Sequence, residues 1–192
     1  MHARRITRRV SLLLPLLAAA CQPIAPPQTF EPLRYEYLPP IRLNVATIDI
    51  EQEFVPSARP PDVSMLDPAP PVEVLRMMAQ DRLRAFGTSG RAAFAINNAS
   101  LIQEGDVISG DMDVVLSVYT SADTRAGYAE ARVQRQHTGP VDNLPATLYD
   151  MTRVMMDAMN VELEYQIRHS LRDWLVPEGA AAPPVQQAPL TE

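Results

Sequence analysis

The stretch GDMDVVLSVYTSADTRAGYAEARVQRQ, residues 110–136, alternates apolar and polar side chains on both sides of a short polar turn. Alternation of this kind is typical of strands with one buried face, so the stretch predicts a β-hairpin that turns around Asp123 and Thr124. The apolar face of the first strand consists of Met112, Val114, Leu116 and Val118. We expect helices to cover that face.

The pairing of the hairpin follows from the position of its turn. A turn with an even number of residues, centred between Asp123 and Thr124, pairs each residue of one strand with a defined partner on the other. On the apolar face the predicted pairs are Val118 with Ala129, Leu116 with Ala131, and Val114 with Val133. On the other face they are Tyr119 with Tyr128, Ser117 with Glu130, and Val115 with Arg132. This second face is mixed in character, and we expect solvent or a partner to contact it.

Two further strands and a helix precede the hairpin. RAAFAINNASLI, residues 91–102, predicts one strand, and IRLNVATIDI, residues 41–50, predicts another with a bulge, because its apolar phase shifts after Val45. PPVEVLRMMAQDRLRAFG, residues 70–87, has helical spacing of its apolar side chains. Pro71 suits the first turn of this helix, and Gly87 suits its C-terminal cap.

A long helix is predicted after the hairpin, from Leu144 to about Leu175, with Asp142 and Asn143 as candidate caps. Its many methionines suit either core packing or an adaptable binding surface. The element order β-α-β-β-β-α predicts an α+β fold, a two-layer sandwich. We expect about four strands in a mixed or antiparallel sheet, with two helices on one face.

Proline-rich segments divide the chain. Residues 21–40 predict a semi-extended tether, residues 41–176 a single α+β domain, and residues 177–192 a disordered tail that is too polar to fold. Within the tether, Tyr35, Tyr37 and Leu38 are apolar enough for part of it to dock on the domain.

The first 20 residues resemble a secretory signal. Four arginines precede an apolar run from Val10 to Ala20, which is shorter than the roughly 20 residues that a membrane-spanning helix needs. The sequence LAAAC, residues 17–21, resembles the bacterial lipobox, in which the cysteine receives diacylglycerol and an amide-linked acyl chain such as palmitate. Cys21 is the only cysteine, and it is the predicted lipid anchor. The alternative is ordinary cleavage after Ala20 that leaves a free thiol.

Lipoproteins of this kind go to the outer membrane unless an aspartate follows the lipidated cysteine. Gln22 follows Cys21 here, so the resemblance implies the periplasmic side of the outer membrane. The expected partners are the membrane, through the anchor, and another envelope protein or lipid. The predicted signal holds four of the 17 basic residues, which leaves 13 against 23 acidic ones. A surface of this charge disfavours nucleic acid as a partner.

No catalytic constellation stands out in the sequence. Asp111 and Asp113 share one strand face, but no histidine or third carboxylate lies near them in the sequence. The residues FGTSGR, 86–91, depart from the G-x-S-x-G pattern of a serine nucleophile. His137 and His169 lie on different predicted elements without zinc spacing. We therefore expect no cofactor, no metal and no enzymatic activity.

The layout of elements resembles a known group of envelope proteins. Residues 41–175 resemble outer-membrane lipoproteins of the lipopolysaccharide-assembly (LptE-like) type, which similarly place a proline-started helix after the last hairpin, as NLPATLYDMTRVMMDAM, residues 143–159, does here. Auxiliary lipoproteins of ABC-type lipid transport systems are comparable. The resemblance implies an accessory lipoprotein of the cell envelope.

We therefore predict a lipid-anchored periplasmic accessory protein that binds another envelope component, such as one that takes part in outer-membrane or lipopolysaccharide assembly. Two alternatives stay open: a lipoprotein hydrolase whose site the sequence does not locate, and a carrier of an apolar ligand or lipid. The partner-binding face is predicted to include Tyr119, Tyr128, Val115 and Arg132. Tyrosine and arginine often carry binding energy at interfaces.

Overall fold

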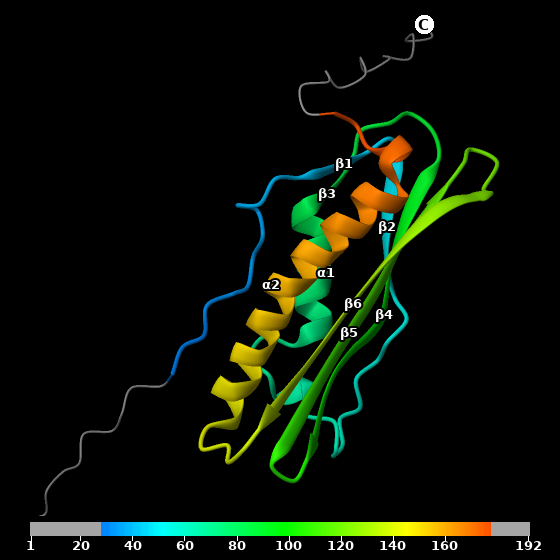
Figure 1. Ribbon diagram of the computed structural model, residues 1–192. Helices are drawn as coiled ribbons and strands as arrows, with labels where there is room; N and C mark the ends of the chain where they lie inside the picture. Colours follow the sequence, from blue (N-terminus) through cyan, green and yellow to red (C-terminus); the bar gives the residue numbers. More distant parts are fainter. Residues whose placement is uncertain (1–27, 178–192) are drawn as a thin grey trace, which may run out of the picture.

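The computed structural model describes residues 28–177, so the predicted signal, Cys21 and residues 178–192 of the predicted tail lie outside the described residues. The strands are β1 (Ile41–Leu43), β2 (Thr47–Gln52), β3 (Leu83–Ala85), β4 (Arg91–Glu104), β5 (Val107–Tyr119) and β6 (Arg125–Thr138). The helices are α1 (Pro71–Arg82) and α2 (Leu144–Ser170), with two short 3-10 turns, η1 (Ser64–Leu66) and η2 (Arg172–Trp174). Figure 1 shows their arrangement.

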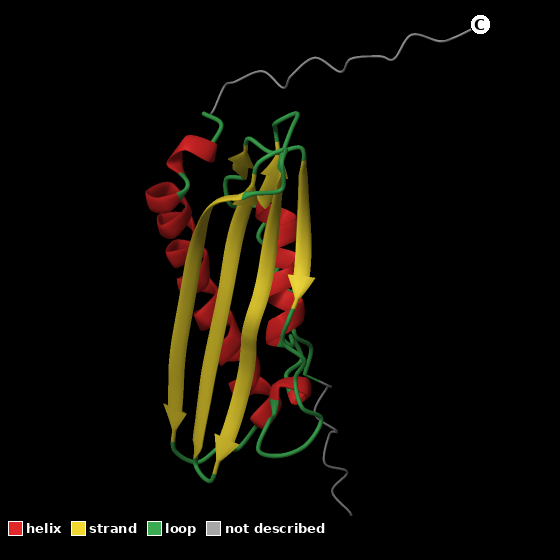
Figure 2. Cartoon of the chain, turned by 90° about the vertical axis from the view of Figure 1, so that its right-hand side faces the viewer, coloured by secondary structure: helices red, strands yellow, loops and turns green. Residues whose placement is uncertain are grey.

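A four-stranded sheet in the order β2-β4-β5-β6 forms one layer. β2 runs parallel to β4, while β4, β5 and β6 form an antiparallel meander. Both helices lie on the same face of this sheet, and the other face is free of helices in the described chain (Figure 2). The predicted α+β sandwich with a mixed four-stranded sheet is therefore confirmed. A small parallel sheet of β1 and β3 lies at one end of it.

The core lies between the sheet and the helices. Met112, Val114, Leu116 and Val118 of β5 are completely buried, as the alternation in the sequence predicts. The methionines of α2 that face them are buried too, namely Met151, Met155, Met156 and Met159. These long, unbranched side chains fill the space between the helix and the sheet.

The start of α2 agrees with its predicted cap, but its end does not. The side chain of Asn143 accepts a hydrogen bond from the backbone N–H of Ala146, and α2 then runs to Ser170 rather than to Leu175. Beyond it the chain pairs with β1: Asn44 N–H donates to the carbonyl of Trp174 (2.7 Å), and Val176 N–H donates to the carbonyl of Arg42 (2.9 Å). Tertiary pairing thus ends the helix.

The single bulged strand predicted for residues 41–50 is wrong. These residues form two strands that belong to different sheets, since β1 pairs with β3 and β2 pairs with β4. The phase shift after Val45 marks the crossing from one sheet to the other.

The helix predicted for residues 70–87 ends earlier, at Arg82. The next three residues form β3, and beyond them Phe86 N–H and Gly87 N–H donate to the carbonyls of Leu43 (2.8 Å) and Val45 (2.9 Å). A Cβ on Gly87 would lie 2.6 Å from the backbone of Asn44 and Val45. Glycine is therefore required here for the close approach of two backbones, and the predicted cap role is wrong.

The hairpin has the predicted faces but a different register. Leu116 pairs with Ala129, Val115 with Glu130 and Ser117 with Tyr128, a shift of two residues from the predicted pairs. The turn contains five residues, Thr120–Thr124, with Asp123 in the left-handed region (φ 57°), and a bulge follows next to Tyr119. A shift of two residues keeps every side chain on its face, which is why the prediction of the faces survives.

Residues 28–40, which belong to the predicted tether, lie along the two helices (Figure 1). Arg34 donates two hydrogen bonds to the carboxylate of Asp81 (2.9 and 2.6 Å), and the backbone N–H of Tyr35 donates a third (2.9 Å). The hydrogen bond from Arg34 is the main reason why the pKa of Asp81 lies below its usual value. Tyr35 is buried, in line with the docking suggested by its apolar character.

Candidate functional site

The helix-free face of the sheet, which we call the open face, is the surface that the sequence singles out. Neighbouring strands place Ala93, Ser117 and Tyr128 side by side across it, because Ala93 pairs with Ser117 and Ser117 with Tyr128. Ala93 and Ser117 are buried although no helix covers them. The long side chains around them therefore shield the small ones, and the centre of the open face is shallow and closely packed.

All four residues predicted for partner binding lie on this open face. Val115 lies opposite Glu130, and Arg132 lies opposite Asp113 rather than opposite Val115 as predicted. Tyr119 lies diagonally across from Tyr128, two pairs further along the hairpin, where it pairs with Arg125. The structure brings the four residues together, with different direct neighbours from those that the sequence suggested.

Each of the two tyrosines stacks with an arginine. The guanidinium carbon of Arg91 lies 4.0 Å from the ring centre of Tyr119, and that of Arg125 lies 4.3 Å from the ring centre of Tyr128. Arg91 also donates to Asp123 (2.9 Å), whereas the Tyr128 side chain stays about half exposed. Aromatic and guanidinium groups held in this way combine apolar area with hydrogen-bond donors, which is typical of protein-binding surfaces.

The other end of the open face is polar and internally paired. Arg132 donates to Asp111 (3.1 Å from Nε), and Gln134 donates to the same carboxylate (3.1 Å). Asn97 donates to Asp113 (3.3 Å). Asp111 and Asp113 therefore have separate polar neighbours and belong to a surface network of polar side chains.

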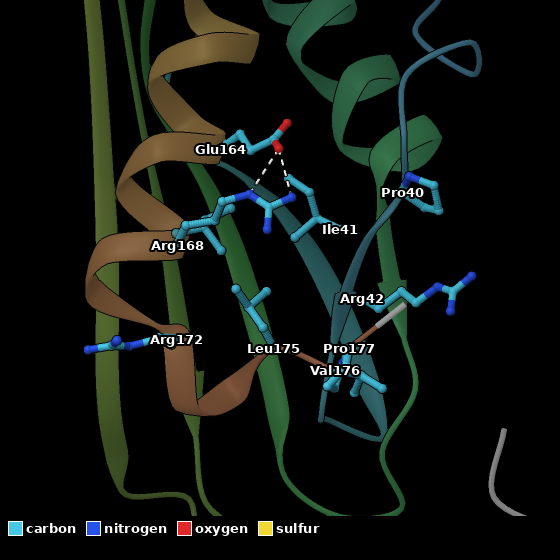
Figure 3. Close-up of a pocket in the computed structure, with 10 residues that line it drawn as sticks. Pro40, Ile41, Arg42, Glu164, Arg168, Arg172, Leu175, Val176 and Pro177 are labelled. Atoms are coloured by element: carbon cyan, nitrogen blue, oxygen red, sulfur yellow. Dashed lines mark hydrogen bonds and ion pairs between the residues drawn. The ribbon is translucent and has the colours of Figure 1, made fainter. Parts of the chain in front are cut away.

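A pocket lies between β1 and the C-terminal end of α2 (Figure 3). The same end of α2 lies near Tyr128, which lines a hollow together with Gln166 and Ser170. Its volume is about 470 Å³. It is lined by Pro40, Ile41, Arg42, Glu164, Ile167, Arg168, Arg172, Leu175, Val176 and Pro177. Its walls are mixed in polarity, and three of its four charged residues are arginines. Sequence reasoning missed it because β1 and α2 lie far apart in the chain.

The charged groups of the pocket do not converge on one point. Arg168 extends into the space between α2 and β1, while Arg42 and Arg172 extend away from it on opposite sides (Figure 3). Arg168 donates to Glu164 from two nitrogens (3.0 and 2.8 Å). The pocket therefore has a lining of mixed polarity, in which Glu164 neutralises part of the positive charge of the arginines.

Glu164 also accepts a hydrogen bond from Arg82 (2.5 Å), which is almost completely buried. Arg82 further donates to the side chain of Asn160 (3.1 Å) and to the carbonyl of Pro39 (3.2 Å). Burial raises the pKa of Glu164, but the hydrogen bonds from Arg82 and Arg168 outweigh it and leave that pKa below the usual value. Arg82 thus joins α1, α2 and the N-terminal segment beneath the pocket.

The sequence did contain a signal for Arg82. It follows Leu75 by seven residues and Ala79 by three, so it stands on the apolar stripe of the helix. A charge in that position must find buried partners.

The remaining sequence candidates are separated. Residues 86–90 form the connection from β3 to β4, where Gly90 has a positive φ (72°), and Arg91 is the first residue of β4. His137 lies on β6, and His169 stacks on Tyr165 near the end of α2 (6.0 Å between ring centres). Among residues 28–177, no group of three or more acidic, histidine or cysteine side chains is placed to hold a metal ion.

In the described part of the chain, neither helix combines the length and hydropathy needed to cross a bilayer. Comparisons with protein-family models and with curated proteins find no match for this chain. The candidate site therefore consists of the open face, with its two tyrosine–arginine stacks, and the pocket at the same end of the molecule.

Proposed function

We propose that this chain is a lipid-anchored accessory protein of the bacterial envelope, held by Cys21 on the periplasmic side of the outer membrane, and that its open face binds another envelope component. The lipobox-like sequence at Cys21 and the following Gln22 support the anchor and the membrane. The resemblance in element order to lipopolysaccharide-assembly lipoproteins supports a role in outer-membrane assembly.

One observation carries the binding role: a helix-free sheet face on which Tyr119 and Tyr128 each stack with an arginine. Tyr128 is 51% exposed although it lies next to closely packed small residues. An exposed aromatic side chain that already stacks with an arginine loses little conformational entropy on binding, so it suits contact with a protein partner.

The methionines offer less support for the alternative role as a lipid carrier. The four methionines between Met151 and Met159 are buried in the core, where they pack between α2 and the sheet. The pocket between β1 and α2 is the other candidate for an apolar ligand, but Glu164 and three arginines line it, and Arg168 extends into it (Figure 3).

Replacement of both tyrosines tests the binding role. Tyr119→Ser with Tyr128→Ser removes two candidate contacts, and loss of two interface side chains of this type lowers affinity by about tenfold or more. In envelopes treated with a crosslinker, the adducts formed by wild type should then decrease sharply. Tyr37→Ser with Tyr165→Ser is the matched control, since both tyrosines are exposed but lie elsewhere.

Both double variants must have the melting temperature of wild type, so that a loss of adducts cannot result from unfolding. Equal adduct yields from wild type and the Tyr119/Tyr128 variant would refute binding by the open face. Equal loss from both variants would show that the effect is not specific to this face.

A further inference from the structure

The N-terminal segment fixes the point at which the chain enters the domain. The side chain of Gln28 accepts a hydrogen bond from Asn143 (2.7 Å), and the ring of Phe30 lies 5.0 Å from that of Tyr149. The hydroxyl of Tyr149 donates to the carbonyl of Glu31 (2.9 Å). These contacts all involve the cap and the first two turns of α2. Residue 28 therefore lies at one end of the molecule, opposite the end that carries Pro177 (Figure 1).

The position of Gln28 limits the reach of an anchor at Cys21. Only residues 22–27 separate the two, and seven Cα–Cα steps span at most about 25 Å. A 14-residue strand such as β6 is about 45 Å long. A lipid on Cys21 would hold the Gln28 end near the bilayer and could not reach the opposite end.

An exposed apolar pair lies at this same end. Met65 and Leu66 are 56% and 58% exposed, and they are adjacent in η1. Asp67, the next residue, accepts a hydrogen bond from the hydroxyl of Thr152 (2.6 Å), in the third turn of α2. Both η1 and residues 28–31 thus contact the first third of α2, which is the lower end of that helix in Figure 1.

The backbone beneath this pair is fixed. The hydroxyl of Ser64 accepts a hydrogen bond from Leu101 N–H (2.7 Å), and Val63 N–H donates to the carbonyl of Leu101 (2.8 Å). Val63 and Ser64 are buried while Met65 and Leu66 point out of the protein. Fixed, exposed apolar side chains of this size gain free energy when they enter the apolar part of a bilayer.

We propose that η1 is a membrane contact: Met65 and Leu66 insert into the lipid surface to which Cys21 is anchored. This inference rests on the proposed function, because it takes the anchor at Cys21 as given. It orients the protein, with the Gln28 end on the bilayer and the pocket and tyrosine–arginine stacks facing away from it. The partner would then approach from the aqueous side.

Tryptophan fluorescence in lipid vesicles tests the orientation. Trp174 is the only tryptophan, and it lies at the end opposite η1. The chain from Cys21 onward is coupled through its thiol to a maleimide lipid in phosphatidylcholine vesicles, with or without bromine on the acyl chains, which quenches nearby tryptophan. A second protein carries Leu66→Trp together with Trp174→Phe, and Met65→Trp replaces Leu66→Trp if that variant does not fold.

We expect bromine to lower the emission of the tryptophan in η1 by about twofold or more and to leave Trp174 unchanged. Equal quenching at both sites, quenching of Trp174 alone, or quenching of neither would overturn the proposal. Chemical coupling bypasses cellular lipidation, so this result does not depend on it. Labelled palmitate on wild type but not on Cys21→Ser in cells tests the anchor separately, and absence of label from wild type would refute the anchor without affecting the vesicle result.

Discussion

The two faces of the sheet are built from alternate residues of the same strands, yet different physical forces maintain them. On β5 the covered face presents Met112, Val114, Leu116 and Val118, which are completely buried beneath the helices. The open face presents Asp111, Asp113, Val115 and Ser117, which meet polar or aromatic neighbours across the strands. Close packing of apolar side chains stabilises the covered face, whereas ion pairs and stacked side chains hold the open face in place. The covered face should therefore tolerate little change, and the open face much more.

We expect the largest difference in stability between changes on the two faces when each change introduces a charge. Leu116→Asp places a carboxylate in the core, at a cost of more than about 4 kcal/mol, which is enough to unfold many domains of this size. Val115→Asp places the same group on the open face, where solvent reaches it, and should cost about 1 kcal/mol or less. Circular dichroism and thermal melting of both variants measure the difference. If Val115→Asp unfolds the protein and Leu116→Asp does not, the faces are assigned the wrong way round.

How far the sequence predicts this division depends on the range of the interactions. The alternation from Met112 to Val118 is local, so it correctly identified the covered face and placed the four candidate binding residues on one surface. The register was not predictable, because the same polar residues fit either an even-numbered turn or the observed five-residue turn followed by a bulge. Gly87 was misread because a helix cap and a close backbone approach both require the absence of a Cβ. The pocket was missed because it brings together distant segments.

A second prediction concerns Asp67, a buried carboxylate on the helix side of the molecule. Burial is the main cause that raises its pKa to about 6, although Thr152 and the Ala69 N–H hydrogen-bond to it. The folded protein therefore binds this proton more tightly than the unfolded chain. The resulting stabilisation is complete below about pH 4 and is lost as the pH rises through 6. Asp67→Asn removes this dependence.

The measurement compares urea unfolding of wild type and Asp67→Asn from pH 4 to pH 7. Relative to wild type, the unfolding free energy of the variant should rise by up to about 3 kcal/mol over this range, because folding raises the pKa of Asp67 to about 6. Asp111→Asn, on the open face, is the control. This change should lower the unfolding free energy by less than about 1 kcal/mol, because it weakens only a surface ion pair. A difference between wild type and Asp67→Asn that does not change with pH would contradict the raised pKa.

A third prediction tests how closely α2 packs on the covered face. A Cβ on Gly110 would lie 2.5 Å from the Met155 sulfur and 3.1 Å from a methyl group of Leu101. Gly110→Val must displace these side chains, and we expect a loss of about 1–3 kcal/mol in unfolding free energy. Ser109→Val introduces the same side chain one residue earlier, on the open face, and should change stability by at most about 0.5 kcal/mol. Similar effects of the two changes would show that the sheet and α2 are loosely packed.

The prediction with the smallest expected effect tests the register of the hairpin through an ion pair on the open face. Arg132 forms an ion pair with Asp111, and because both side chains are on the surface, a double-mutant cycle with Asp111→Ala and Arg132→Ala should give a coupling of about 0.2–1 kcal/mol. The register predicted from the sequence instead places Val115 opposite Arg132. A cycle with Val115→Ala and Arg132→Ala should therefore give no coupling beyond error. Coupling in the second cycle but not in the first would restore the sequence-derived register, and would move Tyr128 from its place beside Ser117 to a direct pair with Tyr119.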